Sequence, residues 1–283
     1  MIVIDGRLEE SEKVLFDVSD RGLTLADGLF ETMLAVDGRV FRRDAHLGRM
    51  IAGAAALAIP IDRARLETDL DLLVGTLPRG EAVVRLTLTR GPGARGARRP
   101  DVARPTVLAT HAAWPKETVM RPLRLVTSTI RRNETSPTSR HKTLGYVDAG
   151  AALAEAEAKG ADDALLFNMR GAVACSTTGN VFAVDGDVIL TPQPDDGILD
   201  GTIRAVVLET ARELGLRTKE MSLAPLEFAA TQALFVTNSV RLVAPIAGLD
   251  RRRYPTDHPT VARLADAIGA RIAAECGRDP RAG

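Results

Sequence analysis

Apolar and polar positions change their spacing along the chain, and these changes predict a mixture of strands and helices. Near the start, apolar residues form short runs between turns, and the pair Asp37-Gly38 separates two of these runs. An Asp-Gly pair between apolar runs is a strong hairpin signal. From Asp44 the apolar residues recur at helical spacing until Pro60. We therefore expect a hairpin followed by an amphipathic helix.

The same two patterns continue to the end of the chain. They predict strands at residues 2–4, 29–36, 39–41, 82–89, 105–110, 123–129, 164–168, 181–184, 188–190, 234–237 and 242–246. They predict further helices at residues 62–77, 147–159, 202–214 and 259–275. Because hairpins dominate and the helices come in blocks, we expect two α+β domains rather than a doubly wound parallel sheet.

The domain organisation follows from the length and from one proline-containing stretch. A chain of 283 residues favours about two domains, each able to bury its own core. The stretch from Trp114-Pro115 to Arg121-Pro122 has the character of a linker. We therefore expect an N-terminal domain at 1–113, a linker at 114–121, and a C-terminal domain with a polar tail at 122–283.

Charge and cysteine content exclude several classes of protein. The 37 basic and 37 acidic residues cancel, so no global field attracts nucleic acid or an anionic membrane. Cys175 and Cys276 lie far apart without metal-ligand spacing, which favours a reducing compartment and no metal site. We find neither a signal peptide nor a run of about 18 apolar residues. We expect a cytoplasmic protein.

Candidate chemistry begins in residues 138–146, immediately before the predicted helix at 147–159. Lys142 stands at the mouth of this helix, and Tyr146 supplies an aromatic hydroxyl four residues later. A lysine in such a place can hold a carbonyl compound as a Schiff base. Most lysines beside a helix start are solvated surface groups. Lys142 is therefore a candidate nucleophile only if other parts of the chain support it.

Two stretches offer groups that bind anions. His46 and Arg49 lie three residues apart at the start of the first long helix and project from one face. The planar guanidinium suits a phosphate, although a solvated helix arginine is the ordinary alternative. Residues 197–204 form a glycine-containing turn that enters a helix, whose first backbone amides could hold an anion. An ordinary turn with a capped helix fits this spacing equally well.

Two further stretches end strands in small polar residues. Residues 235–240 run from a strand into Thr237, Asn238 and Ser239, which could hydrogen-bond a phosphate oxygen or simply end the strand. Residues 171–182 carry a row of small hydroxyls into the next strand. Buried hydroxyls in such a segment need partners, but a polar turn is the plainer interpretation.

Taken in this order, the stretches resemble the class IV, or fold type IV, pyridoxal-phosphate enzymes. This family contains branched-chain and D-amino-acid aminotransferases and aminodeoxychorismate lyase. The resemblance runs from residues 18–22 and 26–32 through 237–239 and Pro245. It implies a smaller N-terminal α/β domain, a larger C-terminal pseudo-barrel domain, and a homodimer.

The resemblance also implies a role for individual residues around the cofactor pyridoxal 5'-phosphate. Lys142 would form the Schiff base and move protons, Arg49 would grip the phosphate, and Tyr146 would contact the hydroxyl of the pyridine ring. The phosphate cup would be completed by the backbone of Thr202 and Ile203 and by the side chain of Ser239, with Asn238 beside it.

Within the family, three stretches most resemble aminodeoxychorismate lyase, namely residues 85–96, 141–146 and 237–241. The first is a strand that leads into a basic loop, and such a loop suits a small amine substrate with two carboxylates, such as 4-amino-4-deoxychorismate. The residues that we expect to bind this substrate are Thr32, Arg90 and Arg95.

One position departs from the family pattern. Cys175 aligns with the glutamate that keeps the pyridine nitrogen protonated, and a thiol is only a weak donor. The ring is then a poorer electron sink, which disfavours reversible transamination more than elimination. We therefore expect a lyase that yields 4-aminobenzoate and pyruvate. The alternatives are a D-amino-acid or branched-chain aminotransferase, a cofactor-binding protein with weak or altered activity, or replacement of the glutamate by Ser176 or Thr177.

Overall fold

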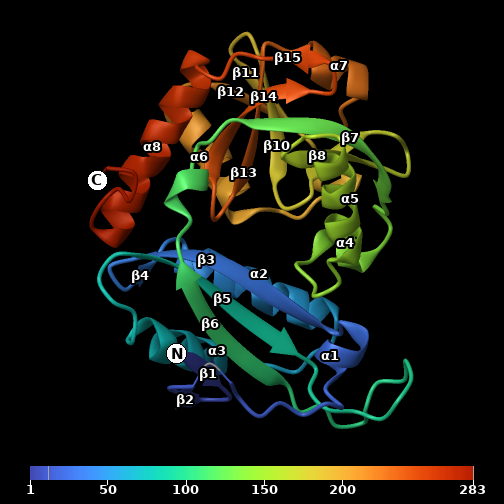
Figure 1. The fold of residues 1–283 in the computed structure, drawn as a ribbon, viewed down its shortest axis with the longest axis vertical. Coiled ribbons are helices and arrows are strands. Elements are labelled where there is room, and N and C mark those ends of the chain that lie inside the picture. Colours follow the sequence, from blue (N-terminus) through green and yellow to red (C-terminus); the bar gives the residue numbers. More distant parts are fainter. Residues whose placement is uncertain (12, 283) are drawn as a thin grey trace. The chain divides into compact units, whose positions relative to one another are not determined.

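The computed structural model describes residues 1–11 and 13–282, which form two compact units (Figure 1). The chain first passes from unit 1 to unit 2 between Trp114 and Pro115, at the start of the segment expected as a linker. Two later segments return to unit 1 instead of staying in the second unit. Unit 1 thus comprises Met1–Trp114, His141–Gly145 and Ile272–Gly283, and unit 2 comprises Pro115–Arg140 and Tyr146–Arg271.

Unit 1 is built on an antiparallel sheet with the strand order β2-β1-β6-β5-β3-β4. The expected Asp-Gly hairpin is confirmed, because β3 and β4 pair on either side of Asp37-Gly38. The longest pairing joins β3 and β5 over nine residue pairs, from Gly28↔Thr89 to Val36↔Glu81. The strands are β1 Ile2–Ile4, β2 Arg7–Glu9, β3 Gly28–Val36, β4 Arg39–Val40, β5 Glu81–Thr89 and β6 Thr106–Ala113.

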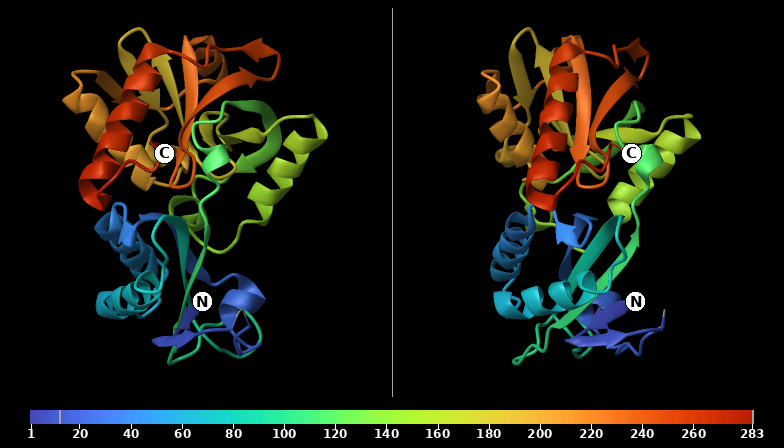
Figure 2. Two further views of the ribbon diagram at one scale, coloured as in Figure 1. Left: turned by 60° about the vertical axis from the view of Figure 1, so that its left-hand side comes forward. Right: turned by 90° about the vertical axis from the view of Figure 1, so that its left-hand side faces the viewer.

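Two helices cover one face of this sheet, as both views of Figure 2 show. They are α2 Arg43–Ala56 and α3 Arg63–Val74, and a short helix, α1 Arg21–Leu25, precedes β3. The apolar stripes of the two long helices pack against alternate strand residues in one buried cluster. Its fully buried members include Met33, Leu47, Leu66, Leu70, Val84 and Leu86.

Residues 275–278 bind the β3–β4 hairpin and the start of β5 within unit 1. Arg278 contacts Asp37 at 2.7 Å and Glu81 at 2.5 Å. Glu275 accepts a hydrogen bond from the backbone of Arg42 at 3.0 Å. These contacts join positions that are more than 190 residues apart in sequence.

Unit 2 contains a nine-stranded mixed sheet that closes on itself. The path β10-β13-β14-β7-β8-β9 returns to its start because Cys175 of β9 pairs with Asn180 of β10. The β7 strand runs parallel to both β14 and β8, so the unit is a barrel-like sheet rather than a meander of hairpins. The strands are β7 Leu123–Arg132, β8 Asp163–Asn168, β9 Val173–Ser176, β10 Asn180–Asp185, β11 Val188–Thr191, β12 Arg217–Glu220, β13 Ala233–Asn238, β14 Leu242–Leu249 and β15 Arg252–Arg253.

Aromatic and ionic contacts fix neighbouring elements of unit 2. Phe182 and Phe235 are a cross-strand pair whose rings stack with centroids 4.8 Å apart, which favours this register of β10 and β13. Arg271 joins α8 to α6 by ion pairs with Glu209 and Glu213. The helices are α4 Pro137–Arg140, α5 Val147–Ala158, α6 Thr202–Glu213, α7 Pro225–Ala230 and α8 Pro259–Cys276, with single 3-10 turns η1 Lys116–Thr118 and η2 Pro194–Asp196.

All five long helices expected from the periodicity are present within a few residues of their expected ends. The elements that we did not expect are short or polar. For example, β12 is mostly exposed and, among the described strands, pairs with β11 alone. Its polar sequence has no apolar alternation to reveal it.

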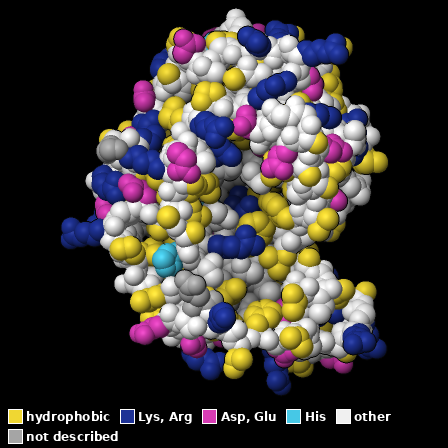
Figure 3. Space-filling model, viewed as in Figure 1, with side chains coloured by type: hydrophobic (Ala, Val, Ile, Leu, Met, Phe, Trp, Pro, Cys, Tyr) yellow, Lys and Arg dark blue, Asp and Glu magenta, His cyan; other side chains and the backbone are white. Residues whose placement is uncertain are grey.

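The surface agrees with the balanced composition. Figure 3 shows Lys and Arg side chains interspersed with Asp and Glu on one face of the molecule. Across the described residues, every helix is too short or too polar to cross a lipid bilayer. No cluster of three or more metal-binding side chains occurs among residues 1–11 and 13–282.

Candidate active site

The lysine segment is an added backbone partner of β3 in unit 1. Phe30 donates its backbone N–H to the carbonyl of Lys142 at 2.9 Å, and Leu144 donates to Gly28 at 3.1 Å. Between these bonds lies an antiparallel bridge, Leu29↔Thr143. The short pairing holds the backbone on both sides of Lys142, so the position of the lysine is set by the sheet rather than by the helix that follows it in sequence.

The amine of Lys142 lies over an aromatic ring that it shares with a second cation. Its Nζ is 4.2 Å from the centroid of Phe30, and the guanidinium carbon of Arg85 is 3.8 Å from the same centroid. Burial lowers the pKa of Lys142 to about 8, with Arg49 and Arg85 lowering it and Glu31 opposing them. A neutral amine is therefore accessible near physiological pH, as a nucleophile or a proton acceptor requires.

The charge of Arg85 gives a prediction about pH. Removing a nearby positive charge stabilises the protonated amine, so Arg85→Gln should raise the pKa of Lys142 and move the onset of its reactivity to higher pH. The measurement is the rate of Lys142 acylation between pH 6 and pH 11 in the two proteins, read by peptide mass. A midpoint near that of a free lysine in the wild type would contradict the lowered pKa.

A buried cluster of three side chains lies on the helix-covered face of unit 1. Glu31 on β3 accepts hydrogen bonds from Nε of Arg49 at 2.7 Å, from Nη2 of Arg49 at 2.6 Å and from Nδ1 of His46 at 2.7 Å. Glu31 and His46 are almost completely buried, whereas the Arg49 side chain is 18% exposed. As expected, His46 and Arg49 share one face of α2, and that face meets a carboxylate.

In unit 2, the helix α6 begins directly after a loop whose backbone is fixed by a hydrogen bond. The N-cap of α6 is Gly201, which has no side chain with which to cap the helix. A Cβ at this position would lie 2.0 Å from Oδ1 of Asn180, whose amide nitrogen donates to the carbonyl of Leu199 at 2.8 Å. The close approach requires glycine, and the backbone amides at Thr202 and Ile203 stand in the first turn of the helix.

The second polar loop of unit 2 follows β13. Asn238 accepts backbone hydrogen bonds from Val240 at 3.0 Å and Arg241 at 2.8 Å through its side-chain oxygen. Asn238 therefore shapes the turn, and Ser239 is half-buried within it. Of the two residues expected at the phosphate, Ser239 has the hydroxyl available to bind while Asn238 has a structural task.

Cys175 lies on β9 in a buried environment. Burial raises the pKa of its thiol, Arg132 opposes this rise and Asp163 adds to it. The thiol is therefore uncharged at neutral pH. The hydroxyl of Thr177 donates to Asp163 at 2.6 Å, so Thr177 is engaged elsewhere. Within the described residues, Oγ of Ser176 and Oγ1 of Thr237 are buried without a hydrogen-bond partner.

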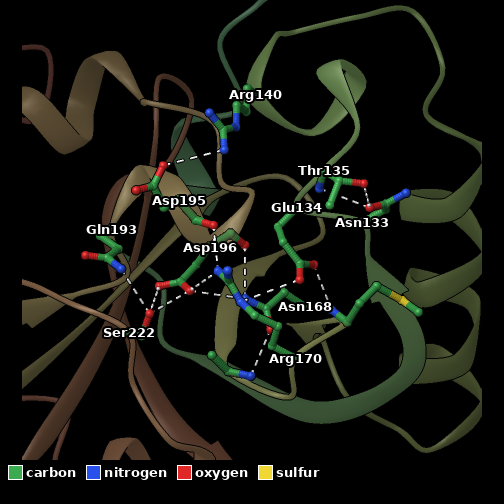
Figure 4. A network of polar contacts seen from close by, with 12 residues as sticks. Asn133, Glu134, Thr135, Arg140, Asn168, Arg170, Gln193, Asp195, Asp196 and Ser222 are labelled. Carbon is green, nitrogen blue, oxygen red and sulfur yellow. Dashed lines mark hydrogen bonds and ion pairs between the residues drawn. The ribbon is translucent and has the colours of Figure 1, made fainter.

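A polar network connects the loop that follows β7 with the loop that precedes α6, and Figure 4 shows its members. Arg170 contacts Asp196 at 3.1 Å and Glu134 at 3.5 Å, and so joins the loop after β7 to the loop before α6. Asp196 also accepts hydrogen bonds from Asn168 at 3.2 Å and Ser222 at 2.8 Å. Because the buried carboxylates have several partners, both loops are held in place.

The residues expected to bind substrate occupy different environments. Thr32 is half-buried on β3, and Arg95 is exposed on the loop after β5. Arg90 is 2% exposed, and its guanidinium binds Asp27 and the carbonyls of Leu57 and Ala58. These contacts make Arg90 a structural residue of unit 1, which differs from the expectation that it binds a substrate carboxylate.

The remaining expected residue, Tyr146, is half-buried at the N-cap of α5 in unit 2. Glu31 has no role in the motifs, although a charged residue inside a largely buried strand is a visible signal. A buried carboxylate needs a partner, and the two candidates on one face of the next helix were His46 and Arg49.

Known proteins with similar sequences agree with these features. The model of the amino-transferase class IV family matches residues 28–249. The chain belongs to this family. Its relatives include a putative branched-chain-amino-acid aminotransferase of Methanocaldococcus jannaschii, 30% identical over 89% of this chain and 88% of that protein. Aminodeoxychorismate lyase of Bacillus subtilis is 28% identical over 90% of this chain and 88% of its own length.

Solved structures confirm the two-domain α+β fold of the class IV enzyme. A hypothetical aminotransferase from Mycobacterium tuberculosis, solved in a PLP-bound form, has a TM-score of 0.87 and 25% identity. The match covers 97% of this chain and 99% of that one. The resemblance inferred from the motifs is thus confirmed, and the cofactor of the class IV enzyme is pyridoxal phosphate.

The residues of each unit fit such a cofactor chemically. Unit 1 supplies a lysine with a lowered pKa and a partly exposed arginine. Unit 2 supplies the start of α6 and buried hydroxyls that lack partners. The neutral thiol of Cys175 is the exception, because it cannot act as a charge partner for a pyridinium nitrogen.

Proposed function

We propose that this class IV enzyme is a lyase that converts 4-amino-4-deoxychorismate to 4-aminobenzoate and pyruvate. The observation that carries the proposal is the buried and uncharged thiol of Cys175, which the resemblance of its flanking residues aligns with the glutamate of the family pattern. A weaker electron sink at the pyridine nitrogen penalises transamination more than elimination. The similarity to the Bacillus subtilis lyase supports the same choice.

In this proposal pyridoxal phosphate supplies an aldehyde for the substrate amine and a ring that withdraws electrons. The amine of Lys142 accepts the proton from the amine-bearing ring carbon of the substrate. The electrons of that C–H bond form a ring double bond as the neighbouring C–O bond breaks, so that enolpyruvate leaves and takes up a proton to become pyruvate. The lowered pKa of Lys142 suits it to accept this proton near neutral pH.

Other residues hold the reactants in the same proposal. Arg49, the first amides of α6 and Ser239 bind the cofactor phosphate, and Tyr146 contacts the ring hydroxyl. The exposed guanidinium of Arg95 binds a substrate carboxylate. We further propose a homodimer that acts on a small amine in the cytoplasm, which suits two cysteines that are both free.

A second candidate function is amino-group transfer between amino and keto acids. The Methanocaldococcus jannaschii relative, a putative branched-chain-amino-acid aminotransferase, favours it at 30% identity. The two functions are separated by supplying the purified protein with either 4-amino-4-deoxychorismate or an amino acid and a keto acid. Pyruvate release that exceeds transamination of D-alanine and branched-chain amino acids is the result that the lyase proposal requires.

A substitution at Cys175 tests the physical basis of the proposal. Cys175→Glu should give the pyridine nitrogen a charge partner and raise the ratio of transamination to pyruvate-releasing elimination. Because a carboxylate is costly to bury, some loss of stability is expected, and folding is followed by thermal unfolding. Cys276→Glu, at the other buried cysteine, is the matched control and should leave the ratio unchanged. A wild-type protein that transaminates faster than it eliminates would refute the lyase proposal.

A further inference from the structure

We propose that Glu31 is a positioning residue for the cofactor phosphate, which it serves by fixing the guanidinium of Arg49. The inference rests on the proposed function only in placing Arg49 at the phosphate. Neither the type of reaction nor the substrate enters it.

The geometry follows from how Glu31 engages Arg49. A guanidinium presents two forks of paired N–H donors, one at its side and one at its end. Glu31 occupies the side fork, with Nε–H to Oε1 at 2.7 Å and Nη2–H to Oε2 at 2.6 Å. A bidentate ion pair fixes the plane of the guanidinium, and it directs the end fork, formed by Nη1 and Nη2, away from the carboxylate. That end fork matches the oxygens of a phosphate.

The environment of Glu31 keeps it in the charged form that this task requires. Burial alone would raise its pKa, but the charge and hydrogen bonds of Arg49 and the hydrogen bond from His46 lower the pKa of Glu31 to about 2. Burial lowers the pKa of His46, the carboxylate of Glu31 opposes this, and the charges of Arg49 and Lys142 add to the lowering. A neutral His46 that donates from Nδ1 then holds the second carboxylate oxygen without adding charge.

Arg49 is held both by its ion-pair partner and by its own backbone. Its partner Glu31 is central in β3, the strand with the longest pairing in unit 1, and its own backbone lies within α2. An unrestrained arginine side chain has many rotamers, and restricting it to one rotamer on ligand binding costs conformational entropy. Because the ion pair with Glu31 forms during folding, the Arg49 side chain loses this entropy before the phosphate binds. The opposing effect is electrostatic, because the negative charge of Glu31 repels a phosphate.

The experiment compares two ligands that differ only in the phosphate. The apo form of the full chain is titrated with pyridoxal phosphate and with pyridoxal, and the ratio of the two Kd values is the phosphate preference. Glu31→Gln should lower this preference about tenfold, which corresponds to ~1.4 kcal/mol, with little change in the Kd of pyridoxal. In an Arg49→Lys background, which lacks the fork, Glu31→Gln should have no additional effect.

Asp27→Asn is the matched control, because Asp27 pairs with the buried Arg90 and Arg21 of the same unit. It should leave the phosphate preference unchanged. If Glu31→Gln does not fold, Glu31→Asp keeps the charge but falls short of Arg49 by one methylene, and it should lower the preference less than tenfold. An unchanged or increased preference in either Glu31 variant would overturn the proposal, and so would equal weakening of both ligands.

The same titration distinguishes a failure of the positioning role of Glu31 from a failure of the proposed placement of Arg49 at the phosphate. If Arg49→Ala abolishes the phosphate preference while Glu31→Gln retains it, only the positioning role of Glu31 fails. If Arg49→Ala itself retains the preference, the placement of Arg49 at the phosphate is wrong and the inference about Glu31 falls with it.

Discussion

Lys142→Ala should abolish covalent attachment of the cofactor and reduce turnover by the largest factor of any single substitution. Borohydride treatment of the wild-type protein should fix pyridoxal phosphate on the peptide that contains Lys142, because this amine lies in a structured segment with a pKa of about 8. The alanine variant has neither the nucleophile nor the proton acceptor, and a positioned general base alone contributes roughly 10²–10⁴-fold. Peptide mass spectrometry and the rate of pyruvate release are the measurements.

The control is Lys159→Ala, which removes an exposed lysine at the C-cap of α5. This variant should retain both the label and the activity. A label found on a lysine other than Lys142 would show that the central assignment is wrong.

Arg49→Ala should weaken cofactor binding to the extent that activity requires added pyridoxal phosphate. The loss of a charge-assisted hydrogen bond typically costs about 1.5–3 kcal/mol, which is roughly ten- to a hundredfold in affinity. The substitution also leaves Glu31 buried without its main partner, so a lower thermal stability is expected. Cofactor titration by absorbance measures the affinity, and excess cofactor should restore activity in the folded fraction.

Arg43→Ala is the comparison on the same helix. Arg43 pairs with Asp71 at the surface, so its removal should cost little stability and leave cofactor affinity unaltered. If Arg49→Ala binds the cofactor as tightly as the wild type, Arg49 has only a structural role as the partner of Glu31.

The sequence revealed the long elements and the motifs because these are local patterns. The helical spacing around Met50 and the Asp37-Gly38 turn depend only on residues close in the chain. The family motifs likewise identified Lys142 and Arg49 as candidates. The motifs could not show which side chains contact Lys142 and Arg49 in the folded protein. The pairing of Glu31 with Arg49 is visible only once the strand and the helix are placed together.

Arg90 shows why residue type alone misleads. Its place before a basic loop suggested a carboxylate ligand on the substrate, but the carboxylate that it binds is Asp27 of the same chain. An arginine whose three guanidinium nitrogens all donate hydrogen bonds within the protein is indistinguishable in sequence from one that faces solvent. The assignment of Lys142 to the C-terminal domain had the same limit, since the two backbone hydrogen bonds that tie residues 142–144 to β3 follow no sequence pattern.

The contacts that residues 275–278 make with the β3–β4 hairpin and with β5 have a consequence for biosynthesis. Glu275 and Arg278 bind Arg42, Asp37 and Glu81, so these contacts cannot form until residues 275–278 have been synthesised. During that interval the β3–β4 hairpin lacks its ionic contacts with the C-terminal residues. Nascent-chain proteolysis should therefore find the β3–β4 hairpin more sensitive before residues 272–282 have emerged than after them, because a contact cannot form before both of its residues have been synthesised.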